Sequence, residues 1–406
     1  MTTFVVIIID DSSAFEYTAE LTPRINTLKT KKGTLFPNFY THPVCTLSRT
    51  GFMFGSYGKK IGHIDETPLH IFPTHPYPSL ASVLTAAGYA TCMIGKWHGG
   101  IDPLFSGLPA PTGTNPHAYA QAPITRGYQQ FRAGHAANLG DTGDYYSWTR
   151  LDSSSSTPGS YTAVTSTTYA PAAMVTEAID WISDTGGANS ATNRFLHLAM
   201  PLPHAPFHVP PSEFLAGYTG NTSTDRGKYL AMLRAADTMV GFILDSLADS
   251  ANVFVWSDNG TPDSVPTPGY NADRLKRTSF KEGSNVLGVY RQNNVPEQVN
   301  TRLMHSIDIG ATILNSAGIA IPAEWDGRPF GNRTDVLTER QDGVEKDRSC
   351  RTGCYLYRAL TSPTGVFTEE LYHTASDPGE STNVLNVTKH AAALAWLRAR
   401  MAEAAI

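Results

Sequence analysis

The chain has 406 residues, of which 41% are hydrophobic and 17% charged, and a formal net charge of −5 at pH 7. This composition is typical of a soluble globular protein with one large domain and an appendage, or with two domains. It argues against nucleic acid as a partner, because no lysine- or arginine-rich block could contact phosphates. It also argues against a membrane span, because no apolar run approaches the roughly 18 residues that such a helix needs.

The four cysteines are too few for a disulfide framework in a chain of this length. Cys350 and Cys354 are close enough in sequence for one bridge, but two reduced thiols fit the spacing equally well. The first residues contain neither the basic region nor the cleavage site of a signal peptide. We therefore expect a cytoplasmic protein, or a periplasmic or secreted one if a leader has been removed.

The first predicted element is a buried strand at residues 4–9, a continuous run of β-branched and aromatic side chains that ends in Asp10 and Asp11. Two adjacent carboxylates at the end of a buried strand repel each other, and a bound cation relieves this repulsion. The alternative is that the second carboxylate or the next serine only caps the turn. A helix is then predicted at residues 24–32, after Pro23.

A cysteine and an arginine four residues apart, Cys45 and Arg49, open a short apolar helix. This spacing places a thiol and a fixed cation about one turn apart. The helix N-terminus adds free N–H groups that attract an anion and lower the pKa of a thiol. The pair therefore suits a site for a tetrahedral oxyanion, although a buried structural cysteine beside a surface arginine is the simpler interpretation of this stretch alone.

The centre of the chain is predicted to alternate helices with strands. We expect helices at residues 79–87, 174–184 and 225–248, and strands at residues 89–94, 194–200 and 252–256. Residues 101–170 are rich in Gly, Pro, Ser and Thr. We expect this stretch to form loops that face the substrate.

Polar or charged side chains come directly after each of these three strands. In chain order they are Lys96 and His98, then His204, then Asp258 and Asn259. Prolines on both sides of His204 make its backbone rigid, which suits a histidine that transfers protons near neutral pH. Each of these groups on its own also occurs in ordinary turns.

The last part of the chain begins with a run of cations that includes Lys276 and Arg277, for which a solvated face is the default interpretation. A strand is predicted at 286–290 and a helix at 306–317. The pattern then changes to short strands at 355–360 and 366–373 and a final helix at 387–401. We expect a catalytic α/β domain at residues 1–335 and a small C-terminal α+β subdomain at residues 336–406.

Strands that alternate with helices predict an α/β fold with a mostly parallel central sheet flanked by helices. Ligands bind such sheets beyond the carboxyl ends of the strands, so the polar groups at these ends are predicted to form one site. Its carboxylate and amide oxygens suit a hard divalent cation, and its cationic side chains suit an anion.

These motifs, in this order, resemble those of the type I sulfatases of the alkaline-phosphatase superfamily. The resemblance runs through most of the chain and covers Asp10 with Asp11, the Cys45 and Arg49 signature, Lys96 with His98, Pro203 with His204, Asp258 with Asn259, Glu282 with Gly283, and Asp377 to Asn383.

The resemblance implies that the chain hydrolyses a sulfate monoester to an alcohol or phenol and inorganic sulfate. It also implies that Cys45 is oxidised to formylglycine, whose hydrate attacks the sulfur. One divalent cation, most similar to the calcium of the family and replaceable by Mg²⁺ or Mn²⁺, would be bound by Asp10, Asp11, residue 45, Asp258 and Asn259.

The same resemblance implies a role for each cation and histidine. Arg49 would stabilise the ionised nucleophile, and Lys96 would contact the sulfate together with Lys276 or Arg277. His204 would protonate the leaving oxygen, and His98 would accept the proton of the second hydroxyl of the hydrate.

At two positions the sequence departs from the family pattern. Leu47 stands where the family usually has Pro or Ala, in the segment that the formylglycine-generating enzyme reads, and Arg277 stands where a lysine is expected. Two alternatives stay open: a phosphonate monoester or phosphodiester hydrolase on the same scaffold, and a non-catalytic relative with an unmodified Cys45. The expected partners are a small sulfate ester and the formylglycine-generating enzyme, and an oligomer is compatible with the sequence.

Overall fold

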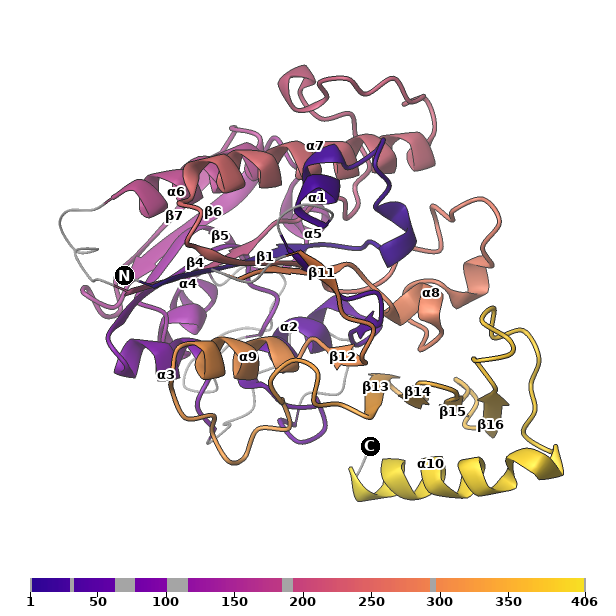
Figure 1. The fold of residues 1–406 in the computed structure, drawn as a ribbon. Helices are drawn as coiled ribbons and strands as arrows, with labels where there is room; N and C mark the ends of the chain where they lie inside the picture. Colours follow the sequence, from indigo (N-terminus) through magenta and orange to yellow (C-terminus); the bar gives the residue numbers. More distant parts are fainter. Residues whose placement is uncertain are drawn as a thin grey trace.

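The computed structural model describes residues 2–29, 33–62, 77–100, 116–184, 193–292 and 297–404. Its core is a sheet with the strand order β11-β2-β10-β9-β1-β8-β4-β5-β6-β7 (Figure 1). In chain order these strands are β1 (Thr3–Ile9), β2 (Thr34–Leu35), β4 (Tyr89–Lys96), β5 (Gln130–His135), β6 (Trp148–Ser154), β7 (Tyr161–Ser166), β8 (Asn193–Ala199), β9 (Asn252–Ser257), β10 (Gly288–Arg291) and β11 (Gln298–Val299). The five strands from β9 to β5 are parallel, and β10, β6 and β7 are antiparallel to their neighbours. The predicted α/β class with a mostly parallel central sheet is confirmed.

Helices cover both faces of this sheet (Figure 1). One face carries α1 (Pro23–Thr27), α6 (Ala170–Ser183) and α7 (Asp225–Ser246), and the other carries α2 (Cys45–Phe54), α3 (Leu80–Ala86), α4 (Pro116–Thr125) and α9 (Asp308–Ser316). The shorter helices are α5 (Leu139–Thr142) and α8 (Lys281–Ser284), with 3₁₀ turns at Ala14–Glu16, Ser212–Phe214, Ala272–Arg274 and Thr388–His390. None of the helices in the described ranges combines the length and the hydrophobicity that crossing a membrane requires.

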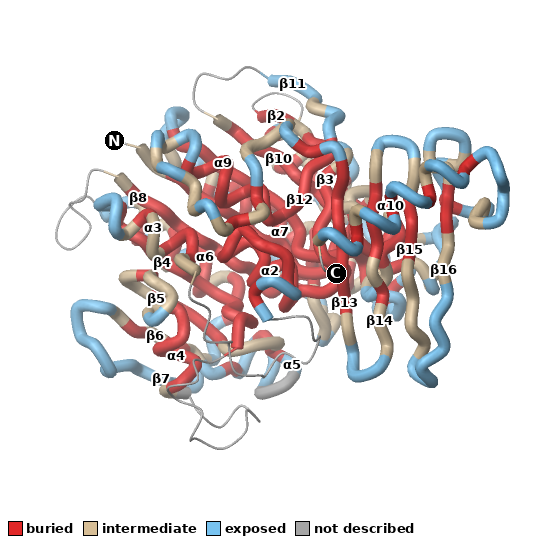
Figure 2. Tube along the Cα trace, turned by 90° about the horizontal axis from the view of Figure 1, so that it is seen from below, coloured by how far each residue is buried: buried red, intermediate tan, exposed pale blue. Residues whose placement is uncertain are grey.

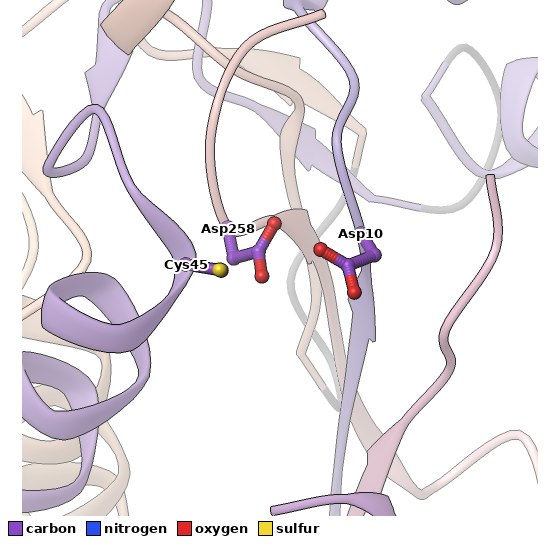
Figure 3. A group of neighbouring side chains, drawn as sticks. All are labelled: Asp10, Cys45 and Asp258. Carbon is purple, nitrogen blue, oxygen red and sulfur yellow. The ribbon is translucent and has the colours of Figure 1, made fainter. Parts of the chain in front are cut away.

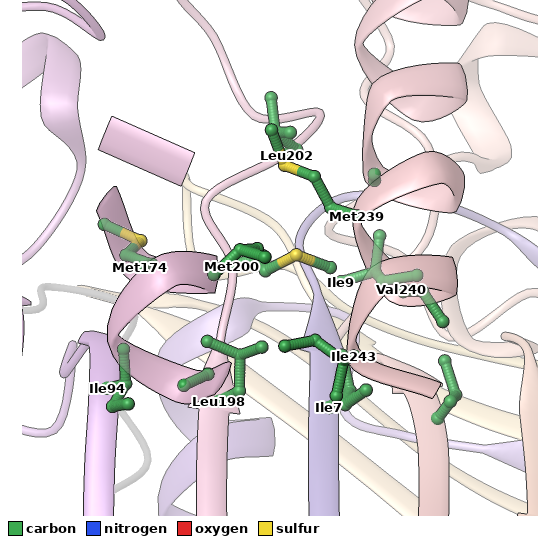
Figure 4. Close-up of a cluster of buried hydrophobic side chains, with 14 of the residues drawn as sticks. Ile7, Ile9, Ile94, Met174, Leu198, Met200, Leu202, Met239, Val240 and Ile243 are labelled. Atoms are coloured by element: carbon green, nitrogen blue, oxygen red, sulfur yellow. The ribbon is translucent and has the colours of Figure 1, made fainter. Parts of the chain in front are cut away.

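The central strand β1 is buried on both of its faces. Ile7 and Ile9 pack toward α6 and α7 (Figure 4), as does Val5. The alternating residues Phe4 and Ile8 belong to the apolar cluster on the opposite side of the sheet. Successive side chains of a strand point to opposite faces, so a strand covered on both sides needs an apolar residue at every position. This is the physical reason for the uninterrupted apolar run, and Figure 2 shows how the buried chain concentrates in this layer.

Residues 101–170 contain more regular structure than predicted. The described part holds α4, β5, α5, β6 and β7, so the expectation of loops throughout is wrong, and residues 101–115 lie outside the described ranges. The strands escaped notice because β7 is the outermost strand and is exposed along nearly its whole length. Its polar residues follow no apolar pattern. Of the helix predicted at 24–32, α1 ends at Thr27, residues 28–29 continue as a π-helical turn, and residues 30–32 lie outside the described ranges.

The C-terminal part of the chain forms a separate antiparallel sheet at one end of the molecule (Figure 1). It consists of β13 (Asp335–Asp342), β14 (Glu345–Thr352), β15 (Leu356–Thr361) and β16 (Phe367–Tyr372), packed on α10 (Ala391–Glu403). A two-stranded sheet of β3 (Phe39–Tyr40) and β12 (Met304–His305) lies beside it. The sequence did not predict β13 and β14, because charged residues fill many of their positions. The division into two domains at residue 335 stays a prediction. Cys350 and Cys354, which the sequence left open as a bridge, are both free thiols.

Candidate active site

The candidate site lies where four neighbouring parallel strands end. β9, β1, β8 and β4 are adjacent in the sheet, and their carboxyl ends lead into the segments that carry Asp258, Asp10, His204 and Lys96. The sequence predicted this convergence, and the structure brings the segments together. The N-terminus of α2, which begins at Cys45, faces the same edge (Figure 3).

Two buried carboxylates and two buried cations form the centre of the site. Asp258 Oδ2 accepts from Arg49 Nε at 2.8 Å and pairs with Arg49 Nη2 at 2.8 Å. Asp10 Oδ2 lies 2.5 Å from Lys96 Nζ and 3.4 Å from Arg49 Nη2. All four side chains are at most 1% exposed. Arg49 therefore links the two carboxylates, and solvent does not screen their charges.

Asp11 makes a second set of contacts in the site, with Lys276, Asn259 and His204. Its Oδ1 accepts from Lys276 Nζ at 2.5 Å and from Asn259 Nδ2 at 2.7 Å. Its Oδ2 lies 3.7 Å from His204 Nε2, and its backbone N–H donates to Asp258 Oδ1 at 3.1 Å. Lys276 is thus a member of the site and not part of a solvated face.

Arg277 lies outside the cluster. Its Nη2 pairs with Asp342 Oδ2 at 2.8 Å, and its side chain is 46% exposed. The residue has a positive φ of 78°, a left-handed turn that separates its side chain from that of Lys276. Of the two cations that the sequence left open, the structure brings only Lys276 to the carboxylates, so the placement of Arg277 in the site is corrected.

Three of the five described non-glycine residues with positive φ belong to these predicted segments: Asp11, His98 and Arg277. Left-handed backbone is strained for residues with a Cβ atom and persists only where the surroundings enforce it. Such strain gathers at sites where side-chain direction matters more than local stability.

Cys45 is buried, and its Sγ lies within 4.8 Å of carboxylate oxygens of Asp10 and Asp258 (Figure 3). Burial raises the pKa of the thiol to about 11, against the lowering effect of Lys96 and Lys276. The pKa is thus raised and not lowered as expected, because loss of solvation outweighs the neighbouring cations. An unmodified thiol here stays protonated at neutral pH and is a weak nucleophile.

The pKa values of the two central carboxylates are shifted in opposite directions. Burial, followed by the neighbouring Asp10 carboxylate, raises the pKa of Asp258 to about 7. Burial also acts to raise the pKa of Asp10, but Lys96 and Arg49 outweigh it and hold that pKa below its usual range. The negative charge of Asp258 is therefore disfavoured next to that of Asp10, and a further cation would stabilise it.

The residues fit a hard divalent cation. Asp10 Oδ1 and Asn259 Oδ1 are buried and accept no hydrogen bond from the described residues. Asp10, Cys45 and Asp258 supply ligand atoms within 4.8 Å of one another. Oxygen donors with free lone pairs are the ligands that calcium and magnesium prefer. The carboxylate of Asp11 is outside this closest group and is already contacted by Lys276 and Asn259.

The two predicted catalytic histidines differ in their surroundings. His98 is 2% exposed, and neither of its ring nitrogens has a hydrogen-bond partner among the described residues. Burial and then Lys96 lower its pKa well below the ordinary value, so the ring is neutral at pH 7. His204 Nδ1 lies 2.8 Å from the Ala205 carbonyl oxygen, to which it donates, and this leaves Nε2 directed toward Asp11.

Two residues near the site were not predicted. His135 ends β5 opposite Lys96, and burial lowers its pKa to about 3. It was missed because β5 lay in the stretch interpreted as loops. The position of His135 directly after Ala133 and Gly134 could have indicated a polar residue at the end of a strand. Tyr229 lies in the helix predicted at residues 225–248, and its hydroxyl donates to the Asp11 carbonyl oxygen at 2.9 Å.

The chain belongs to the sulfatase family, whose model matches residues 2–319. Among curated relatives, N-acetylgalactosamine-6-sulfatase of Sus scrofa is 26% identical over 342 residues, which cover 75% of this chain and 59% of the relative. Arylsulfatase J of Mus musculus is 24% identical over 319 residues, which cover 73% of this chain and 48% of the relative. The match thus spans only about half to three-fifths of the length of these relatives. The resemblance found in the sequence is confirmed.

Solved structures of sulfatases share the fold over almost the whole chain. The structure of Ps i-CgsB in complex with k-i-k-neocarrahexaose has a TM-score of 0.77 and 20% sequence identity, and the match covers 98% of this chain and 92% of that one. BT4656 in complex with D-glucosamine-2-N,6-O-disulfate has a TM-score of 0.70 at 15% identity, covering 98% and 96%. At these identities the comparison shows the fold alone.

Proposed function

We propose that the chain hydrolyses sulfate monoesters to an alcohol or phenol and inorganic sulfate, after oxidation of Cys45 to formylglycine. One observation carries the proposal: Cys45 heads α2 within 4.8 Å of Asp10 and Asp258, whose carboxylates are bridged by Arg49. Membership of the sulfatase family supports it.

Conversion of residue 45 is central to this function, because the thiol itself is buried and protonated. The hydrated aldehyde supplies one hydroxyl to attack the sulfur and a second hydroxyl whose deprotonation releases sulfate. A formylglycine-generating enzyme would carry out the oxidation, acting on a segment with Leu47 in place of the usual Pro or Ala.

The proposed cation, Ca²⁺ in the first instance, would be held by Asp10, Asp11, Asp258, Asn259 and residue 45. It would act as a Lewis acid that favours the ionised nucleophile and offsets the charge of the ester. Oδ1 of Asp10 and Oδ1 of Asn259, which accept no hydrogen bond from the part of the chain that the structure describes, support this ligand set.

Three cations of the chain would bind and orient the ester. Arg49 is held by both Asp10 and Asp258, so its guanidinium is fixed beside residue 45. Lys96 is paired with Asp10, and Lys276 is paired with Asp11. The two ammonium groups would attract the sulfate oxygens. Preorganised charges in a buried site stabilise developing negative charge without reorganisation.

Two histidines would move the protons. His204, whose Nδ1 donates to the Ala205 carbonyl and whose Nε2 faces Asp11, would in its doubly protonated imidazolium form donate the Nε2 proton to the leaving oxygen of the ester, so that the S–O bond breaks to give a neutral alcohol. His98, whose neutral ring has no hydrogen-bond partner among the described residues, would accept the proton from the second hydroxyl at residue 45. Overall, one water is consumed and one alcohol and one sulfate are released.

Peptide mass spectrometry of the tryptic fragment containing residue 45 tests the modification, and turnover tests the reaction. We expect an aldehyde at residue 45 in active protein, loss of activity in Cys45→Ala, and unchanged activity in Cys354→Ala, whose thiol is exposed and remote in the sequence. An active protein with an intact Cys45 thiol would refute the mechanism.

Turnover should be compared on an aryl sulfate, a sulfated N-acetylgalactosamine, a phosphate diester and a phosphonate monoester. We expect the sulfate esters to be hydrolysed faster. A higher kcat/KM on the phosphorus esters would instead assign the site to the phosphonate or phosphodiester reaction.

A further inference from the structure

The backbone conformation of Asp11, just after β1, allows two consecutive carboxylates to lie in the same site. Successive residues of a strand direct their side chains to opposite faces, so Asp10 and Asp11 would diverge if the strand continued. Asp11 instead has a φ of 60°, and both carboxylates join one site. This left-handed conformation is unfavourable for aspartate and needs outside support.

Two hydrogen bonds hold the Asp11 peptide groups in this conformation. Its N–H donates to Asp258 Oδ1 at 3.1 Å, within the site. Its carbonyl oxygen accepts from the Tyr229 hydroxyl at 2.9 Å. Tyr229 is fully buried on α7, a helix that contributes no other residue to the predicted site.

The Tyr229 hydroxyl has a second neighbour, Thr261, besides the Asp11 carbonyl. Thr261 Oγ1 lies 3.3 Å from the same hydroxyl, but it donates its own proton to Glu16 Oε1 at 3.0 Å. Glu16 is in turn held by both Nη atoms of Arg226, at 2.8 and 2.7 Å, and the Arg226 guanidinium lies over the Tyr229 ring at 5.1 Å. The Asp11 carbonyl oxygen can only accept and is the nearer of the two oxygens, and Thr261 Oγ1 already accepts from the Ser13 N–H at 3.2 Å, so the Tyr229 hydroxyl donates to the Asp11 carbonyl.

We propose that Tyr229 is a positioning residue that acts through Asp11: its hydroxyl holds the left-handed Asp11 backbone and so aims the Asp11 carboxylate at Lys276, Asn259 and the cation. The inference rests on the proposed cation site. Partners that orient a metal ligand from behind commonly contribute tenfold or more to metal affinity.

The test uses Tyr229→Phe, which removes one oxygen and keeps the buried ring. Tyr57→Phe is the matched control, because Tyr57 is also buried and its hydroxyl accepts from Arg333 Nη1 at 2.9 Å, outside the predicted site. The readouts are the Ca²⁺ dissociation constant by titration calorimetry, the melting temperature of the Ca²⁺-free protein, and kcat at low and saturating Ca²⁺.

For Tyr229→Phe we expect a Ca²⁺ Kd raised about tenfold, and a loss of turnover at low Ca²⁺ that saturating Ca²⁺ restores. Both variants are expected to lower the melting temperature of the Ca²⁺-free protein by similar amounts. Tyr57→Phe is expected to leave the Ca²⁺ Kd unchanged. An unchanged Kd in Tyr229→Phe, or an equal rise in both variants, would overturn the inference while leaving the proposed function intact. If the wild-type protein binds no Ca²⁺, the proposed cation site fails and this inference with it.

Discussion

Charged side chains in the site are fixed by one another and not by solvent. Arg49, Lys96, Asp10 and Asp258 are almost completely buried, and each has an oppositely charged partner within 3.4 Å. Burial of paired charges adds little net stability, because desolvation offsets their attraction. The proposed function, which requires a bound cation and an anionic ester, explains the arrangement better than a contribution to folding does.

Lys276 and Arg277 provide a direct comparison at this scale. Lys276→Ala should lower kcat/KM on an aryl sulfate about a hundredfold, the typical effect of removing one preorganised donor from an anion site. Arg277→Ala should leave kcat/KM near the wild-type value, since the side chain is exposed and pairs with Asp342 away from the carboxylates of the site. Steady-state kinetics on both variants would decide, and a larger loss in Arg277→Ala would contradict the placement of the two side chains.

At the scale of elements, α2 positions both Cys45 and Arg49, and its C-terminal end is fixed by Gly55. Gly55 has a φ of 55°, and a Cβ atom built on it would lie 2.2 Å from Trp325 Cε3. The helix therefore ends in a left-handed turn against an indole ring. Any shift of this end is transmitted along about three turns of rigid helix to residue 45.

Gly55→Ala should lower the free energy of unfolding by about 2–4 kcal/mol, from backbone strain plus the clash with Trp325. Gly318, just after α9, is the control: its φ is 70°, but a Cβ atom there meets nothing within 4 Å. Gly318→Ala should therefore cost only about 1 kcal/mol. Urea denaturation of both variants measures the difference, and equal losses would show that the Trp325 contact has no effect.

Sequence reasoning succeeded for elements covered on both faces. The apolar runs before Asp10 and Asp258 were recognised because strands in the centre of the sheet exclude polar residues. It failed for β7, which is exposed, and for β13, where Glu339 and Arg340 are buried by tertiary contacts. Periodicity carries no signal where burial does not follow hydrophobicity.

At the scale of the whole molecule, the C-terminal sheet is joined to the α/β core partly through buried polar groups. Glu339 of β13 is 1% exposed, and its Oε1 accepts from the Lys59 backbone N–H at 2.9 Å. Its N–H donates to His42 Nδ1 at 3.2 Å, three residues before Cys45. Burial raises the pKa of Glu339 to about 7.

This joint predicts a pH dependence of stability. The folded protein favours the neutral form of Glu339, so its contribution is full below the unfolded pKa of 4.5 and is lost as the pH rises toward 7. Glu339→Gln should remove this loss. Its unfolding free energy relative to wild type should increase by on the order of 3 kcal/mol between pH 4.5 and pH 8.

Urea denaturation at several pH values measures that difference, and the pH-independent effects of the amide cancel in the comparison. Glu345→Gln is the control, because Glu345 is 37% exposed in its ion pair with Arg340. A relative stability of Glu339→Gln that does not change with pH would contradict the prediction.

A divalent cation bound between strands from distant parts of the chain should stabilise the whole molecule. Ca²⁺ at about one hundred times its Kd should add about 2.7 kcal/mol to the free energy of unfolding, and a chelator should reverse the gain. Asp258→Asn should lose this response, whereas Asp342→Asn, in the exposed pair with Arg277, should keep it. Thermal unfolding with and without Ca²⁺ measures the effect, and an equal response of both variants would argue against Asp258 as a ligand.

The sequence by itself determined the central strands, the residues at their ends and the family, because burial on both faces and reactive side chains leave local patterns that need no coordinates. Only the tertiary structure decided that Lys276 and not Arg277 reaches Asp11, that the Cys45 thiol is protonated, and that Tyr229 supports Asp11. These properties depend on distances between segments far apart in the chain and on the loss of water around charges. Neither quantity is encoded in the spacing of residues along a sequence.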